Sequence, residues 1–275
     1  MGKLRAEQFP FYPLLYEGER NEVKRSISEI PHSVRNDQSS DFCNEDNENL
    51  DSNTLKSAVT SYLGDRFLIR MIPSCRILDY CQNRPQTLEK QQFGTVEDAD
   101  GTLLGARYEG QEIAKMYQIP KDFRLGIDFT PATIDNYQNL MQQVNILHSS
   151  HHAVSNWTNP LESRLNLYNG NITLGELMLK RYPGLFEVFL SCCETHLSTT
   201  ELTDDILTLG TAFLCAGARS VISTLWSVSD IATVIFSLFY YQNRQNNYKP
   251  VEAVQNAQKA LRNLDPATFK AHYYQ

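Results

Sequence analysis

In residues 185–193, LFEVFLSCC, an apolar run passes directly into Ser191, Cys192 and Cys193. A short apolar run of this kind is typical of a strand that is buried on both faces of a sheet. Residues 144–152, VNILHSSHH, repeat the pattern and end in a cluster of histidines. Ligands of open parallel sheets bind at the carboxyl ends of the strands, so we expect these two polar ends to share one crevice.

Strand-like and helix-like segments alternate around these two runs, which is the pattern of an α/β fold with a mainly parallel sheet. Further strands are expected at residues 67–72, 93–96 and 220–226, and helices at residues 109–117, 130–142, 204–216, 230–242 and 250–264. Thr130 and Pro131 mark the expected start of one helix, and Gly217 marks the end of another. The chain of 275 residues is long enough for one such domain, which we place at residues 54–275.

The residues before this domain differ in composition. Residues 36–53 carry six carboxylates and no Lys or Arg, so they supply most of the formal charge of −7. We expect residues 1–53 to form a disordered acidic leader, since they are poor in sustained apolar patterning. A plain solvated segment and a specific acidic docking segment both fit this composition. The negative charge argues against non-specific binding of nucleic acid or anionic membranes.

The six cysteines form no CxxC pair and have no spacing typical of a disulfide framework. The amino terminus lacks the charged and then apolar pattern of a secretory signal. The most apolar stretch near the carboxyl terminus, residues 232–241, is far shorter than the roughly 20 residues of a membrane-spanning helix. We therefore expect a cytoplasmic protein in a reducing compartment, without a membrane partner.

The two strand ends together suggest a cysteine nucleophile and its base. A nearby histidine can generate the thiolate of a cysteine and later protonate a leaving amine. His152 precedes Cys193 by 41 residues, and caspases place their histidine roughly 50 residues before their cysteine. The alternative is that a cysteine beside a buried strand is an inert core residue. We expect this for Cys192, because successive side chains of a strand point in opposite directions.

Several motifs then resemble one family. LSCCET at residues 190–195 is similar to the LSACET motif of CHAT domains, caspase-like cysteine peptidases that are often attached to tetratricopeptide repeats. HSSHHA at residues 148–153 resembles their HFxxHG motif, and residues 216–230 resemble AGAxxV followed by SLWxVxD. Residues 104–109 resemble the LPGAxxE segment, and residues 165–177 the LxLxDGxLTLxEL stretch. The resemblance covers about residues 55–264 and implies a caspase-like three-layer fold, in which helices flank the sheet.

The resemblance also implies roles for individual residues. Cys193 matches the nucleophile and His152 the general base of a cysteine endopeptidase that acts through an acyl-enzyme intermediate. The backbone N–H groups of Ala153 and Cys193 match the oxyanion hole. Supporting roles fall to His148, His151 and Glu194, and for His148 we favour a hydrogen-bonded structural residue.

Asp230 matches the last Asp of the SLWxVxD motif. By analogy with the related separases it would face the S1 pocket and favour Lys or Arg there, because a carboxylate pairs well with a guanidinium or ammonium group. An equally good interpretation is that Asp230 only caps a helix. Three departures accompany the resemblance. Ala153 and His196 stand where the family has glycine, and one or more amino-terminal strands of the family are expected to be missing or replaced.

Other functions stay open at this point. The runner-up is a catalytically weak or truncated CHAT-like module that binds a protein. A metal hydrolase that uses the three histidines is disfavoured because HExxH is absent, a serine hydrolase because GxSxG is absent, and a phosphate-binding loop because GxxxxGK[ST] is absent. We expect no metal and no cofactor. The expected partners are a protein substrate and a tetratricopeptide-repeat or other regulatory protein in trans, with no nucleic acid.

Overall fold

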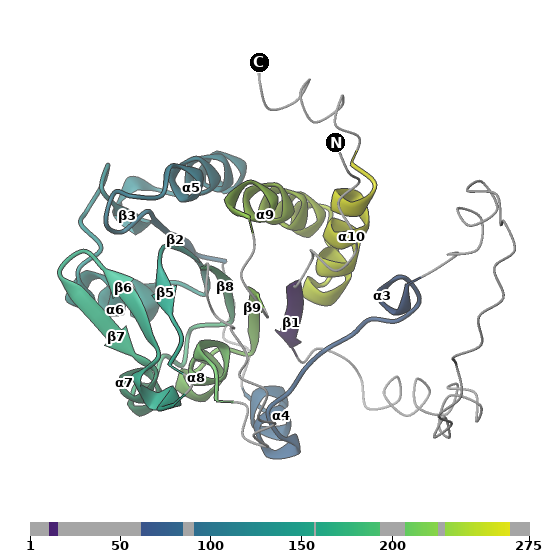
Figure 1. Cartoon of the computed structure of the whole chain (residues 1–275), viewed down its shortest axis with the longest axis horizontal. Coiled ribbons are helices and arrows are strands. Elements are labelled where there is room, and N and C mark those ends of the chain that lie inside the picture. The colour runs from purple at the N-terminus through teal and green to yellow at the C-terminus, as the bar shows by residue number, and fades with distance from the viewer. Residues whose placement is uncertain are drawn as a thin grey trace, which may run out of the picture. The chain divides into compact units, whose positions relative to one another are not determined.

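A six-stranded sheet forms the centre of the computed structural model (Figure 1). The structure describes residues 11–15, for which only the backbone is considered, and residues 62–84, 91–156, 158–192, 207–224 and 229–264. The strands lie in the order β1 (Phe11–Leu15), β9 (Ser220–Thr224), β8 (Glu187–Ser191), β4 (Ile146–Ser150), β2 (Phe93–Glu97) and β3 (Arg124–Gly126). All neighbours are parallel except β1, which pairs antiparallel with β9.

Helices cover both faces of this sheet. The helices α5 (Leu104–Tyr117), α9 (Asp230–Gln245) and α10 (Pro250–Arg262) lie on one face. On the other face lie α6 (Ile134–Gln143), α7 (Leu174–Leu179) and α8 (Leu209–Ala216), with α4 (Cys75–Gln82) beside α8 (Figure 1). The short 3-10 helices are η3 (Lys121–Phe123) and η4 (Pro160–Glu162). The predicted α/β architecture with a mainly parallel sheet between helical layers is confirmed.

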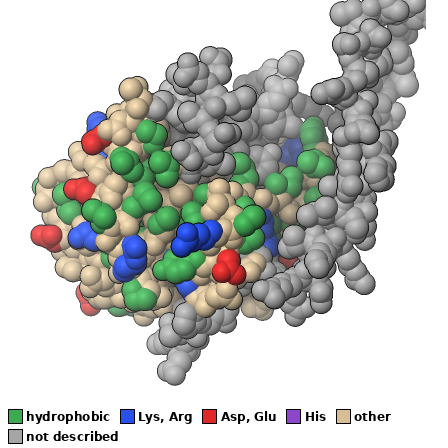
Figure 2. Space-filling model, turned by 90° about the horizontal axis from the view of Figure 1, so that it is seen from below, with side chains coloured by type: hydrophobic (Ala, Val, Ile, Leu, Met, Phe, Trp, Pro, Cys, Tyr) green, Lys and Arg blue, Asp and Glu red, His purple; other side chains and the backbone are tan. Residues whose placement is uncertain are grey.

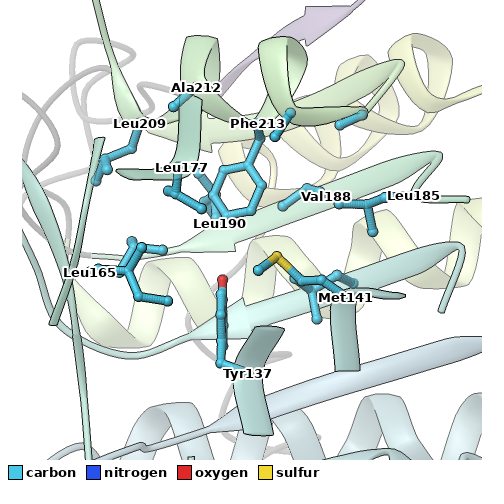
Figure 3. Close-up of a cluster of buried hydrophobic side chains, with 14 of the residues drawn as sticks. Tyr137, Met141, Leu165, Leu177, Leu185, Val188, Leu190, Leu209, Ala212 and Phe213 are labelled. Carbon is cyan, nitrogen blue, oxygen red and sulfur yellow. The ribbon is translucent and has the colours of Figure 1, made fainter. Parts of the chain in front are cut away.

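The apolar runs of the sequence form strands because their residues alternate between two cores. Val188 and Leu190 of β8 pack with α6, α7 and α8, in the cluster shown in Figure 3. Phe189, between them, packs on the opposite face with Phe236 and Tyr240 of α9. All five residues of β8 are buried, as expected for a central strand covered on both faces.

A second, smaller sheet follows β4. It consists of β5 (Ala153–Val154), β6 (Arg164–Leu167) and β7 (Gly170–Thr173), which are all antiparallel. The sequence pattern does not indicate these strands, because they are short and carry only one or two buried residues each. Gly170 has a φ of 155°, which a side chain would disfavour, so the turn between β6 and β7 needs glycine.

The structure corrects a predicted strand and a predicted helix start. Residues 67–72 form no strand; Met71 packs against the core from an irregular segment, and Ser74 then caps α4 by accepting a bond from the N–H of Ile77. The helix predicted from Thr130 begins only at Ile134, because the hydroxyl of Thr133 caps it by accepting from the N–H of Asn136 at 3.2 Å. The predicted stop at Gly217 is confirmed, with a φ of 151°.

The expectation of little stable structure before residue 54 is wrong for β1. Its pairing places Phe11 opposite Thr224 and Leu15 opposite Ser220. A sheet edge offers unpaired backbone groups to almost any extended segment, so such pairing leaves little trace in the sequence pattern. The acidic segment at residues 36–53 lies outside the described residues.

The chain divides into two units, residues 17–67 and the remainder. In the smaller unit the structure describes only α3 (Leu63–Arg66) with its flanking residues, where the carboxylate of Asp65 accepts a bond from the N–H of Tyr62 at 3.2 Å. No helix in the described part of the chain is long and apolar enough to cross a membrane.

Candidate active site

The strand register brings three loops to one edge of the sheet. Glu97 of β2 lies opposite Ser150 of β4, and Ser150 lies opposite Ser191 of β8. The described residues that follow β2 and β4, including His152, therefore leave the sheet side by side, and Cys192 follows β8 at the same edge. Cys193 and Glu194 follow β8 but lie outside the described residues.

His152 is held by Thr102, which no sequence motif indicates. Its Nε2 lies 2.9 Å from the hydroxyl oxygen of Thr102, in the loop after β2. This hydroxyl donates to Oδ1 of Asp100 at 2.6 Å, and the same oxygen accepts from the N–H of Thr102 at 3.2 Å. Partial burial opposes ionisation of Asp100, yet the bonds from Thr102 and the nearby His152 hold the pKa of its carboxyl below the ordinary value.

Asp98 fixes the loop that carries Thr102. Its buried carboxylate accepts from the N–H of Leu103 at 2.9 Å and from two nitrogens of Arg107, at 2.7 and 3.2 Å. Its own N–H donates to the carbonyl of Ser150 at 2.9 Å, which ties the loop after β2 to the end of β4. Asp98 has a φ of 53°, a left-handed conformation that short polar side chains tolerate better than most.

His151 is buried and neutral. Its Nδ1 lies 2.9 Å from the carbonyl oxygen of His152, which can only accept, so Nδ1 carries the proton. Its Nε2 then accepts from the hydroxyl of Ser149 at 2.8 Å, and this hydroxyl accepts from Tyr137 at 3.0 Å. Burial lowers the pKa of His151 to about 4, which outweighs the favourable bond to the His152 carbonyl.

The carbonyl of His152 is fixed by two donors, because the N–H of Asn166 also reaches it at 2.9 Å. The peptide between His152 and Ala153 is planar, so these bonds also fix the direction of the Ala153 N–H. Ala153 is buried in β5 and has no positive φ. The replacement of glycine at this position therefore introduces no left-handed strain.

His148 lies in the core between the sheet and α9. Its Nε2 is 3.5 Å from Oε1 of Glu109, its Nδ1 is 3.2 Å from the hydroxyl of Tyr241, and its ring lies against Phe189. His148, His151 and His152 thus have three separate sets of partners. Among the described residues, no three His, Cys, Asp or Glu side chains gather as a metal site would require. His148 and His151 are buried, and no histidine side chain is visible on the face shown in Figure 2.

A narrow crevice lies at the same edge of the sheet, between α5 and α9. It has about 20 Å³ of free volume, which is room for about one water molecule. Its lining is formed by the acidic and hydroxyl residues Glu109, Ser150, Ser191, Asp230 and Thr233 and by the apolar residues Leu103, Ala106 and Val234. Asp230 is the first residue of α9, and the capping position belongs to Ser229. The structure therefore places Asp230 in the crevice and not at the cap, although its charge still suits the start of a helix.

A comparison with known protein families identifies the family of this chain. The model of the CHAT domain matches residues 45–274, which cover most of the chain and include every candidate residue described above. No curated protein matches the chain. The parallel sheet between helical layers, with His152 and the residues that precede Cys193 at one edge, agrees with a caspase-like fold. This chain belongs to the CHAT domain family.

Proposed function

We propose that the protein is a cysteine endopeptidase that acts through His152 and Cys193. The observation that carries the proposal is the placement of His152 at the carboxyl end of β4, beside the end of β8 from which the chain continues to Cys193. Neighbouring parallel strands lie about 4.8 Å apart, so residues just beyond their paired ends can approach within reach of each other.

The proposed reaction has two stages. His152 takes the proton of the Cys193 thiol, and the thiolate attacks the carbonyl carbon of the scissile peptide bond. The N–H groups of Ala153 and Cys193 would hold the negative oxygen that forms. His152 returns its proton to the leaving amine, which gives the acyl-enzyme. A water molecule, deprotonated by His152, then attacks the thioester and releases the acid and the thiol.

The crevice lined by Ser150 and Ser191, at the ends of β4 and β8, supports a preference for Lys or Arg at the P1 position. Asp230 and Glu109 place two carboxylates in it, and no Lys or Arg is among the described residues that line it. Glu109 is buried, and although burial opposes its ionisation, His148, Ser237 and Ser150 hold its pKa below the ordinary value, so the crevice keeps its negative charge. The present volume of the crevice fits only about one water molecule, so the proposed preference requires the crevice to widen when a basic side chain binds.

A protein substrate and a regulatory protein that acts in trans, such as a tetratricopeptide-repeat protein, belong to the same proposal. So does a reducing, cytoplasmic location. This location is supported by Cys75, Cys81 and Cys215, which form no disulfide among the described residues.

A peptide acyloxymethyl ketone with Lys at P1 tests the proposal, because it alkylates a cysteine activated within a substrate site. The expected result is one adduct at Cys193, which disappears in Cys193→Ala and falls strongly in His152→Ala. Cys75→Ser is the matched control and should keep the adduct, since Cys75 is an exposed thiol on α4 and belongs to none of the strands. An adduct that persists in Cys193→Ala, together with unchanged cleavage of a peptide panel by this variant, contradicts the enzyme function and favours a binding module.

A further inference from the structure

The proton count at Thr102 decides which nitrogen of His152 is the base. A threonine hydroxyl has one hydrogen to donate and lone pairs to accept with. The Asp100 carboxylate can only accept, and at 2.6 Å it takes the hydrogen of the Thr102 hydroxyl. The contact of 2.9 Å between this hydroxyl and Nε2 of His152 must then be an N–H bond donated by the histidine.

This assignment holds in both charge states of the ring. In the imidazolium form both nitrogens carry protons, and in the neutral form the proton on Nε2 is the one that makes the bond to Thr102. Nδ1 is therefore the nitrogen that gains and loses a proton. A negative group that acts on a histidine from the side opposite the base nitrogen also stabilises the imidazolium, as in the catalytic triads of hydrolases.

We propose that Thr102 and Asp100 are positioning residues, which form a side-chain relay that fixes His152 as the Nε2–H tautomer and leaves Nδ1 as the base. The relay rests on the proposed function only for the identity of the proton donor, the Cys193 thiol. In the reaction, the S–H bond breaks and an Nδ1–H bond forms, so that a thiolate and an imidazolium result. The proton on Nε2 stays with His152, and Asp100 stays ionised.

The surroundings of Asp100 and Thr102 support a built relay. Asp98 holds the loop at both ends, through its bonds to Ser150 and Leu103, and Arg107 closes the loop through Asp98 and the carbonyl of Gly101. The pKa of Asp100 lies below its ordinary value, in agreement with a carboxylate that stays ionised beside His152. Asp100 and Thr102 are exposed, so replacing them removes the relay without opening a cavity.

Nitrogen NMR of the full chain, labelled with ¹⁵N histidine, reads the tautomer directly and does not depend on peptidase activity. The expected wild-type spectrum at neutral pH shows His152 protonated at Nε2. Thr102→Val keeps the shape and removes the hydroxyl, so the spectrum should shift toward a mixture of tautomers, whereas Thr102→Ser should restore the wild-type pattern. Asp100→Asn should give a smaller shift, and Asp128→Asn, an exposed carboxylate 3.8 Å from Arg107, is the matched charge control and should give none.

In the peptidase assay, Thr102→Val should lower kcat/KM by about 10- to 100-fold, mainly through kcat, and Thr102→Ser should recover most of it. An Nδ1–H tautomer in the wild type, or an unchanged tautomer in Thr102→Val, overturns the relay. If the tautomer follows Thr102 as described while Cys193 never reacts, the relay stands and the proposed peptidase function fails.

Discussion

Ser150 and Ser191 lie opposite each other at the ends of β4 and β8, and their hydroxyls donate to the same oxygen of Glu109, at 2.8 and 2.9 Å. The other oxygen of Glu109 faces His148 at 3.5 Å. One buried carboxylate from α5 thus joins the two strands that lead to His152 and to Cys193. A change at Glu109 should therefore affect both the stability of the fold and the geometry of the candidate site.

Glu109→Gln tests this carboxylate. The variant keeps the size of the side chain but leaves two hydroxyls and His148 without a charged acceptor, so we expect a loss of about 1 to 3 kcal/mol in the free energy of unfolding. The pH dependence should change too. Because the folded pKa of Glu109 lies below the ordinary 4.5, its ionised form stabilises the fold above that pH, and this contribution is lost as the pH falls below about 4.5.

Urea unfolding between pH 3 and 7 measures both effects. The control is Glu112→Gln on the same helix, where the carboxylate pairs with an exposed Lys115 and should contribute less than about 0.5 kcal/mol. Equal stabilities of the two variants at neutral pH would contradict the structural role of Glu109.

The titration of His151 should make the stability of the fold depend on pH over a higher range than the titration of Glu109. Its folded pKa of about 4 lies below the ordinary 6.5, so the unfolded chain takes up the proton first. Stability is complete above pH 6.5 and falls as the pH drops toward 4, by about 3 kcal/mol from this residue. His151→Gln removes the titration, and the urea midpoint of the variant should vary less over this window than that of the wild type. An unchanged slope would mean that His151 is already protonated in the fold.

Two glycines of α5 form a matched pair. A Cβ at Gly110 would clash with the side chain of Glu97, which is buried and held by Thr95 and by both ends of the Arg124 guanidinium. A Cβ at Gly105 would meet Val234 and Asp230 at ordinary distances of 3.5 and 3.6 Å. We expect Gly110→Ala to cost about 1 to 3 kcal/mol of stability, and Gly105→Ala to be neutral or to stabilise by up to about 1 kcal/mol. Thermal unfolding of the two variants compares them, and a larger loss in Gly105→Ala would refute this packing of α5.

The central part of the fold could be predicted because its signals are local. Val188, Phe189 and Leu190 form a continuous apolar run, which a strand with two covered faces requires. The segment at residues 67–72 carries a similar run, but it joins neither of the two sheets that the described residues form. Conversely, β1 exists through its pairing with β9 and not through any periodicity of its own. Pairing between distant segments is the information that a single sequence pattern lacks.

The residues of the candidate site also form two groups, those that sequence motifs indicate and those that only the structure reveals. His152 and Asp230 were identified through motifs, and the structure places Asp230 beside Ser150 and Ser191 in one crevice. No motif indicates Thr102 and Asp100, although they lie in a polar turn, DADGT at residues 98–102, one residue beyond the predicted strand at residues 93–96. The turn lies close to His152 because β2 pairs with β4, and the sequence pattern does not show this pairing. The family match does not identify such residues, because their role depends on one hydroxyl in one loop.

The exposure of each cysteine predicts how fast it reacts with a labelling reagent, and the interpretation of an adduct at Cys193 depends on these rates. Cys192 is 1% exposed and its thiol lies 3.6 Å from the carbonyl of Ser149, while burial raises the pKa of Cys81. Only a thiolate that reaches the reagent reacts, so iodoacetamide should modify exposed Cys75 at least about tenfold faster than Cys81 or Cys192 in the folded protein. A time course in Cys193→Ala, followed by peptide mass spectrometry, measures Cys192 without its neighbour. In urea the three rates should converge, which controls for intrinsic reactivity. Rapid labelling of Cys192 in the folded variant would show that the end of β8 opens readily, and an adduct at Cys193 would then report access and not activation by His152.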